Sequence, residues 1–511
     1  MKFPDVSCST IHRHILAVSA YYLIALLAVL FLMYFATDGR VAYTMDSLTY
    51  RDAALNFMSG NPMQSTNVVT LFPERQPLIV WPPAYPAIWA SAAYLGNADI
   101  DAVPSILNPI LLGMTLLIVF WICLMITRKP FIACVVAIMS GFVPSTMTVY
   151  GHAWSETLFI PLILLSYAAL LRYRISREKF IWIAVAAIFI GLANWVRYAG
   201  VAFLPILVFS IFVLSGAAFG KRIMHATGAV LLSTALVFPL WFRNWQLSGN
   251  ISGSNRGGSG NPDQWVNDVV TIADLFEHSL FAFDYAIRSN LEIPILLTIV
   301  FATIGAFRRH GTQWLRPVEI WLPIVWLTGY LLFLLYARVA QKGVPMDLRM
   351  LAVAFPFALF ALTPAVDAAF ANRSLNIRKI LIILMLGLLI NSGRSEADRV
   401  RENYASAGVP GWRSDYALLF RDMRNTSPIG RAIQEAIGPI SPSELILTND
   451  RALYIRYLTG AKAYSPHYGS DCSGWEDNFG KGLLLIRSRM LPPWAIDCLK
   501  NPTQWRLLQA N

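Results

Sequence analysis

The sequence predicts a polytopic α-helical membrane protein of about eleven transmembrane helices, with a long first extracytoplasmic loop and a small C-terminal α/β domain outside the membrane. Two observations predict this class. Apolar residues make up 56% of the 511-residue chain and charged residues only 14%, a balance unlike that of soluble domains. The apolar residues also fall in runs long enough to cross a bilayer as helices.

The first apolar run covers residues 15–35. It is too long for a signal peptide and no small-residue cleavage site follows it, so we expect an uncleaved anchor. Ten further runs predict spans at residues 104–126, 131–149, 157–171, 180–195, 199–215, 223–242, 291–307, 318–337, 349–370 and 378–392.

Charges between the runs predict the orientation. Segments 1–14, 128–129, 172–179, 221–222, 308–316 and 373–379 are rich in Lys and Arg and contain only two acids, Asp5 and Glu178. The positive-inside rule places them in the cytoplasm of a plasma (inner) membrane protein, with the N-terminus. The net charge of +11 then reflects topology and contact with membrane lipids. Because it is dispersed over separate turns, we expect no nucleic-acid partner.

An odd number of spans places residues 393–511 outside the membrane, so we divide the chain into a membrane core, 1–392, and a soluble domain, 393–511. The second part is typical of a small α/β domain. Its predicted strands cover residues 444–448, 461–464, 482–487 and 505–509, and its predicted helices cover 451–458 and 493–499. Cys472 and Cys498 lie there, where the compartment allows either two thiols or a disulfide.

Two predicted outer loops, 36–103 and 243–290, are too long for simple turns, and long loops often carry function. In the first, Pro82 and Pro83 end an extended run and begin an amphipathic helix. The second is rich in Gly, Ser and Asn from 248 to 262. It is either a lid or a plain flexible linker.

Ionisable side chains gather at the predicted outer ends of several spans. Charge is costly at a membrane, so we expect these groups to pair or to line a polar cavity. For a single arginine, snorkelling is the simpler explanation, Glu156 also suits a helix start capped by Ser155, and Glu74 also suits a solvated loop. The candidates, with two nearby tyrosines, are Asp46, Tyr50, Glu74, Tyr85, His152, Glu156, Arg197, Arg243, Arg256, Lys342, Asp347 and Arg349.

A carboxylate and several cations are the parts needed to move a sugar from a lipid phosphate to a hydroxyl. The carboxylate takes the proton of the attacking hydroxyl, and the cations stabilise charge on the leaving phosphate. We therefore expect Arg197, Arg243, Arg256, Lys342 and Arg349 to bind the donor. Tyr50, Glu74, Tyr85, His152, Glu156 and Asp347 would complete the cavity.

An ordered set of short motifs resembles the integral-membrane glycosyltransferases of the C superfamily (GT-C), which include protein O-mannosyltransferases and lipid A aminoarabinose transferases. The motifs are Asp46-Ser47-x-x-Tyr50, Pro82-Pro83-Ala84-Tyr85-Pro86, Ser155-Glu156, Arg197-x-x-Gly200, Arg243-Asn244 and Arg349. The resemblance covers roughly residues 10–395 and implies a polyprenyl-phosphate sugar donor, a hexosyl or pentosyl transfer with inversion, and Asp46 as the catalytic aspartate. The acceptor would be a lipid, a glycan or a protein.

The chain departs from the family pattern at two places. Where relatives often have a double acid, this chain has Asp46-Ser47, and the next acid is Asp52. We therefore assign no cofactor, since a divalent metal such as Mg²⁺ or Mn²⁺ has no clear ligand set. Where some relatives have Lys before the Pro-Pro pair, this chain has Trp81, so the phosphate contact passes to other cations.

Two other classes place charge at a membrane face. A transporter or lipid flippase would show inverted repeats and half-helices broken at the midplane, and the sequence shows neither. A scaffold that only displays the outer domain would leave the charged set and the long first loop unexplained. The sequence therefore favours a transferase.

Overall fold

The computed structural model describes residues 8–37, 41–66, 75–176, 178–216, 218–253, 318–340 and 348–371, together with five short strands between 417 and 509. The predicted spans at 291–307 and 378–392 lie outside these residues. So do six predicted site or disulfide residues: Glu74, Arg256, Lys342, Asp347, Cys472 and Cys498. The number of spans therefore stays a prediction.

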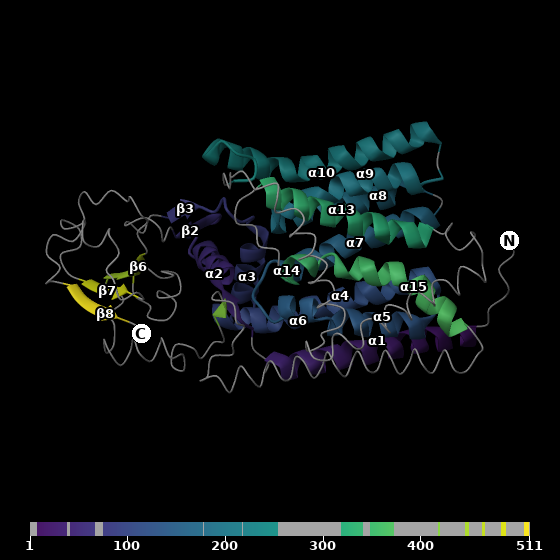
Figure 1. The fold of residues 1–511 in the computed structure, drawn as a ribbon, viewed down its shortest axis with the longest axis horizontal. Helices are drawn as coiled ribbons and strands as arrows, with labels where there is room; N and C mark the ends of the chain where they lie inside the picture. The colour runs from purple at the N-terminus through teal and green to yellow at the C-terminus, as the bar shows by residue number, and fades with distance from the viewer. Residues whose placement is uncertain are drawn as a thin grey trace.

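The described part of the membrane core is one helical bundle, in which α1 and α10 occupy opposite edges (Figure 1). Within it α7 packs on α8 and α4, α10 packs on α8, and α13 packs on α15. The bundle helices are α1 (Cys8–Thr37), α4 (Val103–Thr127), α5 (Pro130–Phe142), α7 (Glu156–Ile175), α8 (Phe180–Val196), α9 (Phe203–Leu214), α10 (Phe219–Ser248), α13 (Val318–Ala340) and α15 (Phe355–Ala371).

Length and composition identify the membrane-crossing segments in this bundle. Four described helical segments are long and apolar enough to cross a membrane: 100–127, 156–175, 219–248 and 321–338. Five shorter apolar helices accompany them, at 18–31, 130–142, 180–196, 198–213 and 355–364. A spanning backbone must satisfy its own polar groups, which explains why the core is helical.

Two predicted spans are interrupted helices. The predicted span 131–149 is divided into α5 and α6 (Pro144–Tyr150), because Val143 between them is extended at φ −63° and ψ 132°. The residue before a proline disfavours the helical region, and Pro144 follows Val143. The predicted span 349–370 is likewise divided into α14 (Leu348–Leu351) and α15. The two short helices that result, α6 and α14, lie near one end of the bundle (Figure 1).

The first outer loop folds against that end of the bundle (Figure 1). It contains β1 (Tyr43–Thr44), α2 (Met45–Met58), β2 (Gln64–Thr66), β3 (Arg75–Pro77), α3 (Ala84–Leu95) and the 3₁₀ turn η1 (Ile100–Ala102). Helix α2 packs on α3, and α3 begins directly after Pro83, as predicted. Fully buried Tyr85 and Trp89 fix α3 in the core.

Four strands fall within the four ranges predicted for the C-terminal region. They are β5 (Leu445–Thr448), β6 (Lys462–Tyr464), β7 (Gly482–Ile486) and β8 (Trp505–Gln509), and they form a parallel sheet of order β6-β5-β7-β8. A two-residue strand, β4 (Ala417–Leu418), pairs antiparallel with β1. The predicted helices of this region lie outside the described residues, so the α/β domain itself stays a prediction.

Candidate active site

Asp46 lies in the first turn of α2, at the end of the bundle where the first outer loop packs. The helix begins with a capping box, in which Thr44 Oγ1 accepts from the Ser47 amide and Ser47 Oγ accepts from the Thr44 amide. Ser47 thus has a structural role at the position where relatives often carry a second acid. An acid in the first turn is favoured by the helix dipole. The sequence placed Asp46 in the first outer loop, and the structure shows that this part of the loop is the capped helix α2.

Arg349, from α14, is the partner of Asp46. Its Nη1 lies 2.5 Å from Asp46 Oδ2, although 303 residues separate the two in sequence. The side chain of Arg349 is 9% exposed and that of Asp46 is 23% exposed. A pair this shielded interacts more strongly than a surface ion pair, because solvent screens it less.

Glu156, the first residue of α7, extends this pair into a chain of four charges. Its Oε1 lies 2.6 Å from Arg197 Nη1 and 3.2 Å from Arg349 Nε, and the residue is only 1% exposed. Arg349 therefore bridges the two carboxylates, Asp46 and Glu156. Two charges of each sign balance one another, which is the condition for burying them.

Ser155 and Tyr50 complete the polar network. Ser155 occupies the N-cap position of α7, as predicted, but its hydroxyl makes no capping bond. Instead its Oγ accepts from Arg197 Nη1 at 3.0 Å, lies 3.0 Å from the Tyr50 hydroxyl and donates to Glu156 Oε2 at 3.3 Å. Burial, and then the Asp46 charge, raise the pKa of Tyr50, so its hydroxyl keeps its proton at neutral pH.

Tyr85 and His152, two further candidates, lie behind this network. Tyr85 is fully buried and packs edge-on against Tyr50 and Trp89. His152 is buried too, with Nδ1 2.7 Å from the Thr148 carbonyl and its ring stacked on Trp154 at 4.1 Å. Both residues therefore support the walls of the site.

Trp154 and Asn108 are site neighbours that the sequence candidates missed. The Arg349 guanidinium lies over the Trp154 ring, 5.0 Å from its centroid. Asn108, in α4, donates to the Tyr150 and His152 carbonyls at 2.8 Å each, which holds the turn between α6 and α7 in place. The sequence signal for Asn108 is an amide within an apolar run, which often joins helices. The signal for Trp154 is its position directly before Ser155 and Glu156.

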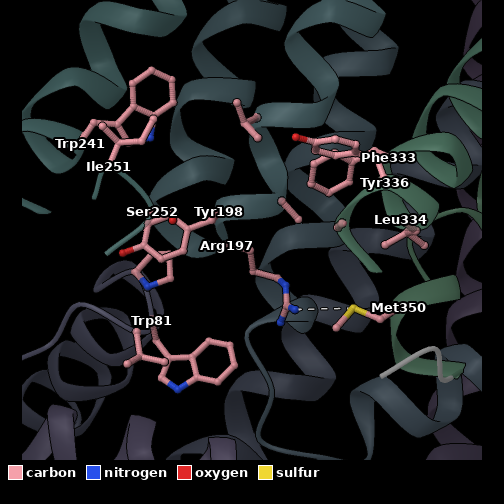
Figure 2. Close-up of a pocket in the computed structure, with 15 residues that line it drawn as sticks. Trp81, Arg197, Tyr198, Trp241, Ile251, Ser252, Phe333, Leu334, Tyr336 and Met350 are labelled. Carbon is pink, nitrogen blue, oxygen red and sulfur yellow. Dashed lines mark hydrogen bonds between the residues drawn. The ribbon is translucent and has the colours of Figure 1, made fainter. Parts of the chain in front are cut away.

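An apolar cavity of about 290 Å³ adjoins the charged chain, with Arg197 in its wall (Figure 2). Figure 2 shows the Arg197 guanidinium directed toward Met350, whose Sδ lies 3.8 Å from Nη2. The rest of the wall is mainly apolar and aromatic: Val80, Trp81, Pro82, Tyr198, Ala199, Val201, Trp241, Ile251, Ser252, Phe333, Leu334, Tyr336 and Ala337. Such a cavity suits the apolar part of a ligand whose charged group reaches Arg197.

Arg243, a predicted donor-binding residue, makes hydrogen bonds to the backbone of the first outer loop. Its guanidinium donates to the Met63 carbonyl at 2.9 Å and to the Leu78 carbonyl at 3.1 Å. Its neighbour Asn244 donates to the Tyr198 hydroxyl at 2.8 Å. These bonds fasten the first outer loop to α10 beside the cavity.

The described residues do not fit a resident metal. Among them no group of three or more His, Cys, Asp or Glu residues could hold an ion. The two carboxylates of the site face arginines, and a cation there would have to displace a guanidinium.

The fold is similar to those of a solved archaeal oligosaccharyltransferase and of solved ArnT. No family model and no curated protein matches the chain. The likeness is to solved structures, at sequence identities of 14% or less, and it defines the fold alone. With the apolar helices, it marks a multi-pass membrane protein.

Two particular enzymes share this fold. ArnT from Cupriavidus metallidurans, bound to undecaprenyl phosphate, matches with a TM-score of 0.51 and 10% identity over 88% of this chain and 87% of that chain. The oligosaccharyltransferase AglB from Archaeoglobus fulgidus, in complex with an inhibitory peptide and a dolichol-phosphate, matches with a TM-score of 0.53 and 12% identity over 91% of this chain. Its complex with Zn and sulfate matches with a TM-score of 0.51 and 14% identity over 87% of this chain. The chain spans 62% to 66% of the archaeal enzyme.

Proposed function

We propose that the protein transfers a sugar from a polyprenyl-phosphate donor to an acceptor hydroxyl at the outer face of the membrane, with Asp46 as general base and with inversion. The supporting observation is the chain Asp46–Arg349–Glu156–Arg197 beside an apolar cavity that shares Arg197 with it. The charged chain suits proton transfer, and the cavity suits an amphiphile with an anionic head group.

The chemical step assigns each of these groups a task. The acceptor hydroxyl gives its proton to Asp46 Oδ1, since Oδ2 is held by Arg349. Its oxygen bonds to the anomeric carbon while the bond from that carbon to the phosphate oxygen breaks. The electron pair of that bond stays on the polyprenyl phosphate, where Arg197 stabilises the charge. Attack from the side opposite the phosphate inverts the carbon.

The cavity gives the donor its orientation. The polyprenyl chain would lie against the aromatic wall, and its phosphate would reach the Arg197 edge of the cavity. Two of the structural neighbours were solved with polyprenyl-type phosphates, dolichol-phosphate in AglB and undecaprenyl phosphate in ArnT, which supports this class of donor.

The direct test uses the purified full chain and a panel of labelled polyprenyl-phosphate sugars, with lipid, glycan and peptide acceptors. Release of polyprenyl phosphate is measured with and without a chelator, because AglB was crystallised with Zn. We expect release with at least one sugar. No release across the panel, together with lipid-dependent solute flux, would favour a transporter instead.

The general-base assignment predicts that Asp46→Asn lowers turnover by about 10²- to 10⁴-fold, the usual contribution of such a base. The matched control is Asp52→Asn on the same helix, where the carboxylate accepts from Asn56 at 3.4 Å. We expect the control to turn over like the unmodified protein. Undiminished turnover by Asp46→Asn would end the assignment.

A further inference from the structure

Trp154 contacts both the start of α2 and Arg349. Its indole N–H donates to Thr44 Oγ1 at 2.8 Å, and Thr44 is the N-cap of the helix that carries Asp46. The face of its ring lies 5.0 Å from the Arg349 guanidinium carbon. A single side chain therefore contacts the N-cap of α2, which carries the candidate base, and the cation that holds that base.

The backbone that carries Trp154 is fixed to the first outer loop. Ala42 N–H donates to the Gly151 carbonyl at 2.8 Å, and Ala153 N–H donates to the Ala42 carbonyl at 2.9 Å. On the other side, Thr157 Oγ1 donates to the Trp154 carbonyl at 2.7 Å. The indole, only 8% exposed and stacked on His152, has little room to move.

Arg349 needs an external support of this kind. It lies on α14, a helix of only four residues, and an arginine side chain has many rotamers. The carboxylates of Asp46 and Glu156 hold the nitrogens of its guanidinium. The face of the Trp154 ring holds the plane of the guanidinium. Stacking on an aromatic face is a contact that arginine makes readily.

We propose that Trp154 is the positioning residue for the sugar transfer proposed above: its N–H sets the start of α2, its ring sets the plane of Arg349, and together they fix Arg349 against Asp46. The inference rests on that proposed function. Trp154 lies outside the apolar cavity, so its loss should slow the chemical step and leave donor binding nearly unchanged.

The kinetic test compares Trp154→Leu with Trp182→Leu. Trp182, near the start of α8, is a matched control, because Arg172 in the last turn of α7 lies over its ring at 5.8 Å. We expect Trp154→Leu to lower kcat by about 10- to 100-fold, as misplaced groups do, and to change the donor KM by less than about threefold. Trp182→Leu should keep kcat. A Trp154→Leu protein with undiminished kcat would overturn the proposal.

A conservative variant separates the two contacts and guards against misfolding. Trp154→Phe keeps an aromatic face for Arg349 and lacks the N–H that reaches Thr44. We expect it to recover part of the kcat lost in Trp154→Leu. Combining Trp154→Phe with Thr44→Val should lose less than the product of the two single losses, because both remove the same Trp154–Thr44 hydrogen bond, while Thr44→Val alone also removes the capping bond from Ser47. Fully multiplicative losses would refute the Thr44 contact as the means of positioning.

A second measurement does not depend on turnover. The rate of Arg349 modification by phenylglyoxal, located by peptide mass spectrometry, reports how well the guanidinium is held. We expect faster modification in Trp154→Leu and an unchanged rate in Trp182→Leu. If the unmodified protein turns over no donor, the proposed function fails, while the labelling still decides whether Trp154 positions Arg349. Equal Arg349 labelling in all three proteins would overturn the positioning role.

Discussion

Glu156 is the most deeply buried charge of the site, and two arginines depend on it. Removing one partner of a buried ion pair leaves an uncompensated charge, which typically costs about 3 to 5 kcal/mol. We expect Glu156→Ala to lower the free energy of unfolding by about that amount. Denaturation of the purified protein in detergent would measure it.

The control for this prediction is an ion pair near the surface. Arg174 pairs with Glu178 at 3.4 Å, and its side chain is 43% exposed. Exposed pairs contribute about 0 to 1 kcal/mol, so Arg174→Ala should change stability little. If Glu156→Ala and Arg174→Ala lower the free energy of unfolding equally, the charged chain contributes no more to stability than a surface ion pair does.

At the residue scale, the sequence named the charged residues of the candidate site but not the contacts between them. Asp46, Glu156, Arg197 and Arg349 were all placed at outer span ends, and the structure brings them into one chain. Hydropathy gives the depth of a residue in the membrane but not which neighbour it faces. For that reason the sequence did not indicate that the Arg243 guanidinium donates to the Met63 and Leu78 carbonyls.

At the scale of elements, Glu178 joins two turns on the side predicted to be cytoplasmic. It lies in the turn between α7 and α8 with a positive φ of 60°, a strained value for a non-glycine residue. Its carboxylate accepts from Ser215 Oγ at 2.8 Å and from the Gly216 amide at 2.6 Å, after the end of α9. This clasp holds the strained turn in place.

The clasp predicts a pH dependence of stability. Burial alone would raise the pKa of Glu178, but the hydrogen bonds from Ser215 and Gly216 and the charges of Arg174 and Lys221 outweigh it and lower the pKa below the ordinary 4.5. Its contribution is therefore present above the ordinary pKa and is lost as pH falls through the lowered one. We expect Glu178→Gln to be less stable than the unmodified protein at neutral pH.

Thermal unfolding at a series of pH values would check this. The difference in unfolding temperature between the two proteins should become smaller as the carboxylate protonates, because both then carry a neutral side chain at position 178. If the difference in unfolding temperature is the same at every pH, the effect of Glu178→Gln comes from the shape of the side chain and not from its charge.

Element boundaries were harder to predict than element existence. Every predicted span that lies within the described residues overlaps helix, two of them as interrupted helices, because bilayer thickness sets the length of an apolar run. The break at Val143 was missed, since hydropathy is continuous across it and only the following Pro144 marks it. The boundary between α15 and the short helix α14, which carries Arg349, was missed for the same reason.

At the scale of the whole molecule, the elements predicted to be outside gather at one end of the bundle (Figure 1). Which side of the membrane this end faces follows from the positive-inside rule alone. We predict that Ser59→Cys, in an exposed turn after α2, reacts with an impermeant maleimide on intact cells. Lys221→Cys, exposed near the start of α10, should react only after permeabilisation.

These variants would be prepared in a background without the native cysteines, of which Cys123 and Cys134 are buried thiols. Peptide mapping would locate the label. The reverse pattern, with position 221 labelled on intact cells and position 59 protected, would invert the topology and move the site to the cytoplasmic face.

The separation of 303 residues between Asp46 and Arg349 has a consequence for biosynthesis. At about 5 to 20 residues per second, a ribosome needs about 15 to 60 s to add the arginine after the aspartate. Until then the nascent α2 depends on its own capping box, which closes within three residues. The ion pair can form only after the segment bearing α14 has left the ribosome, so a chain interrupted before that point has Asp46 without its partner.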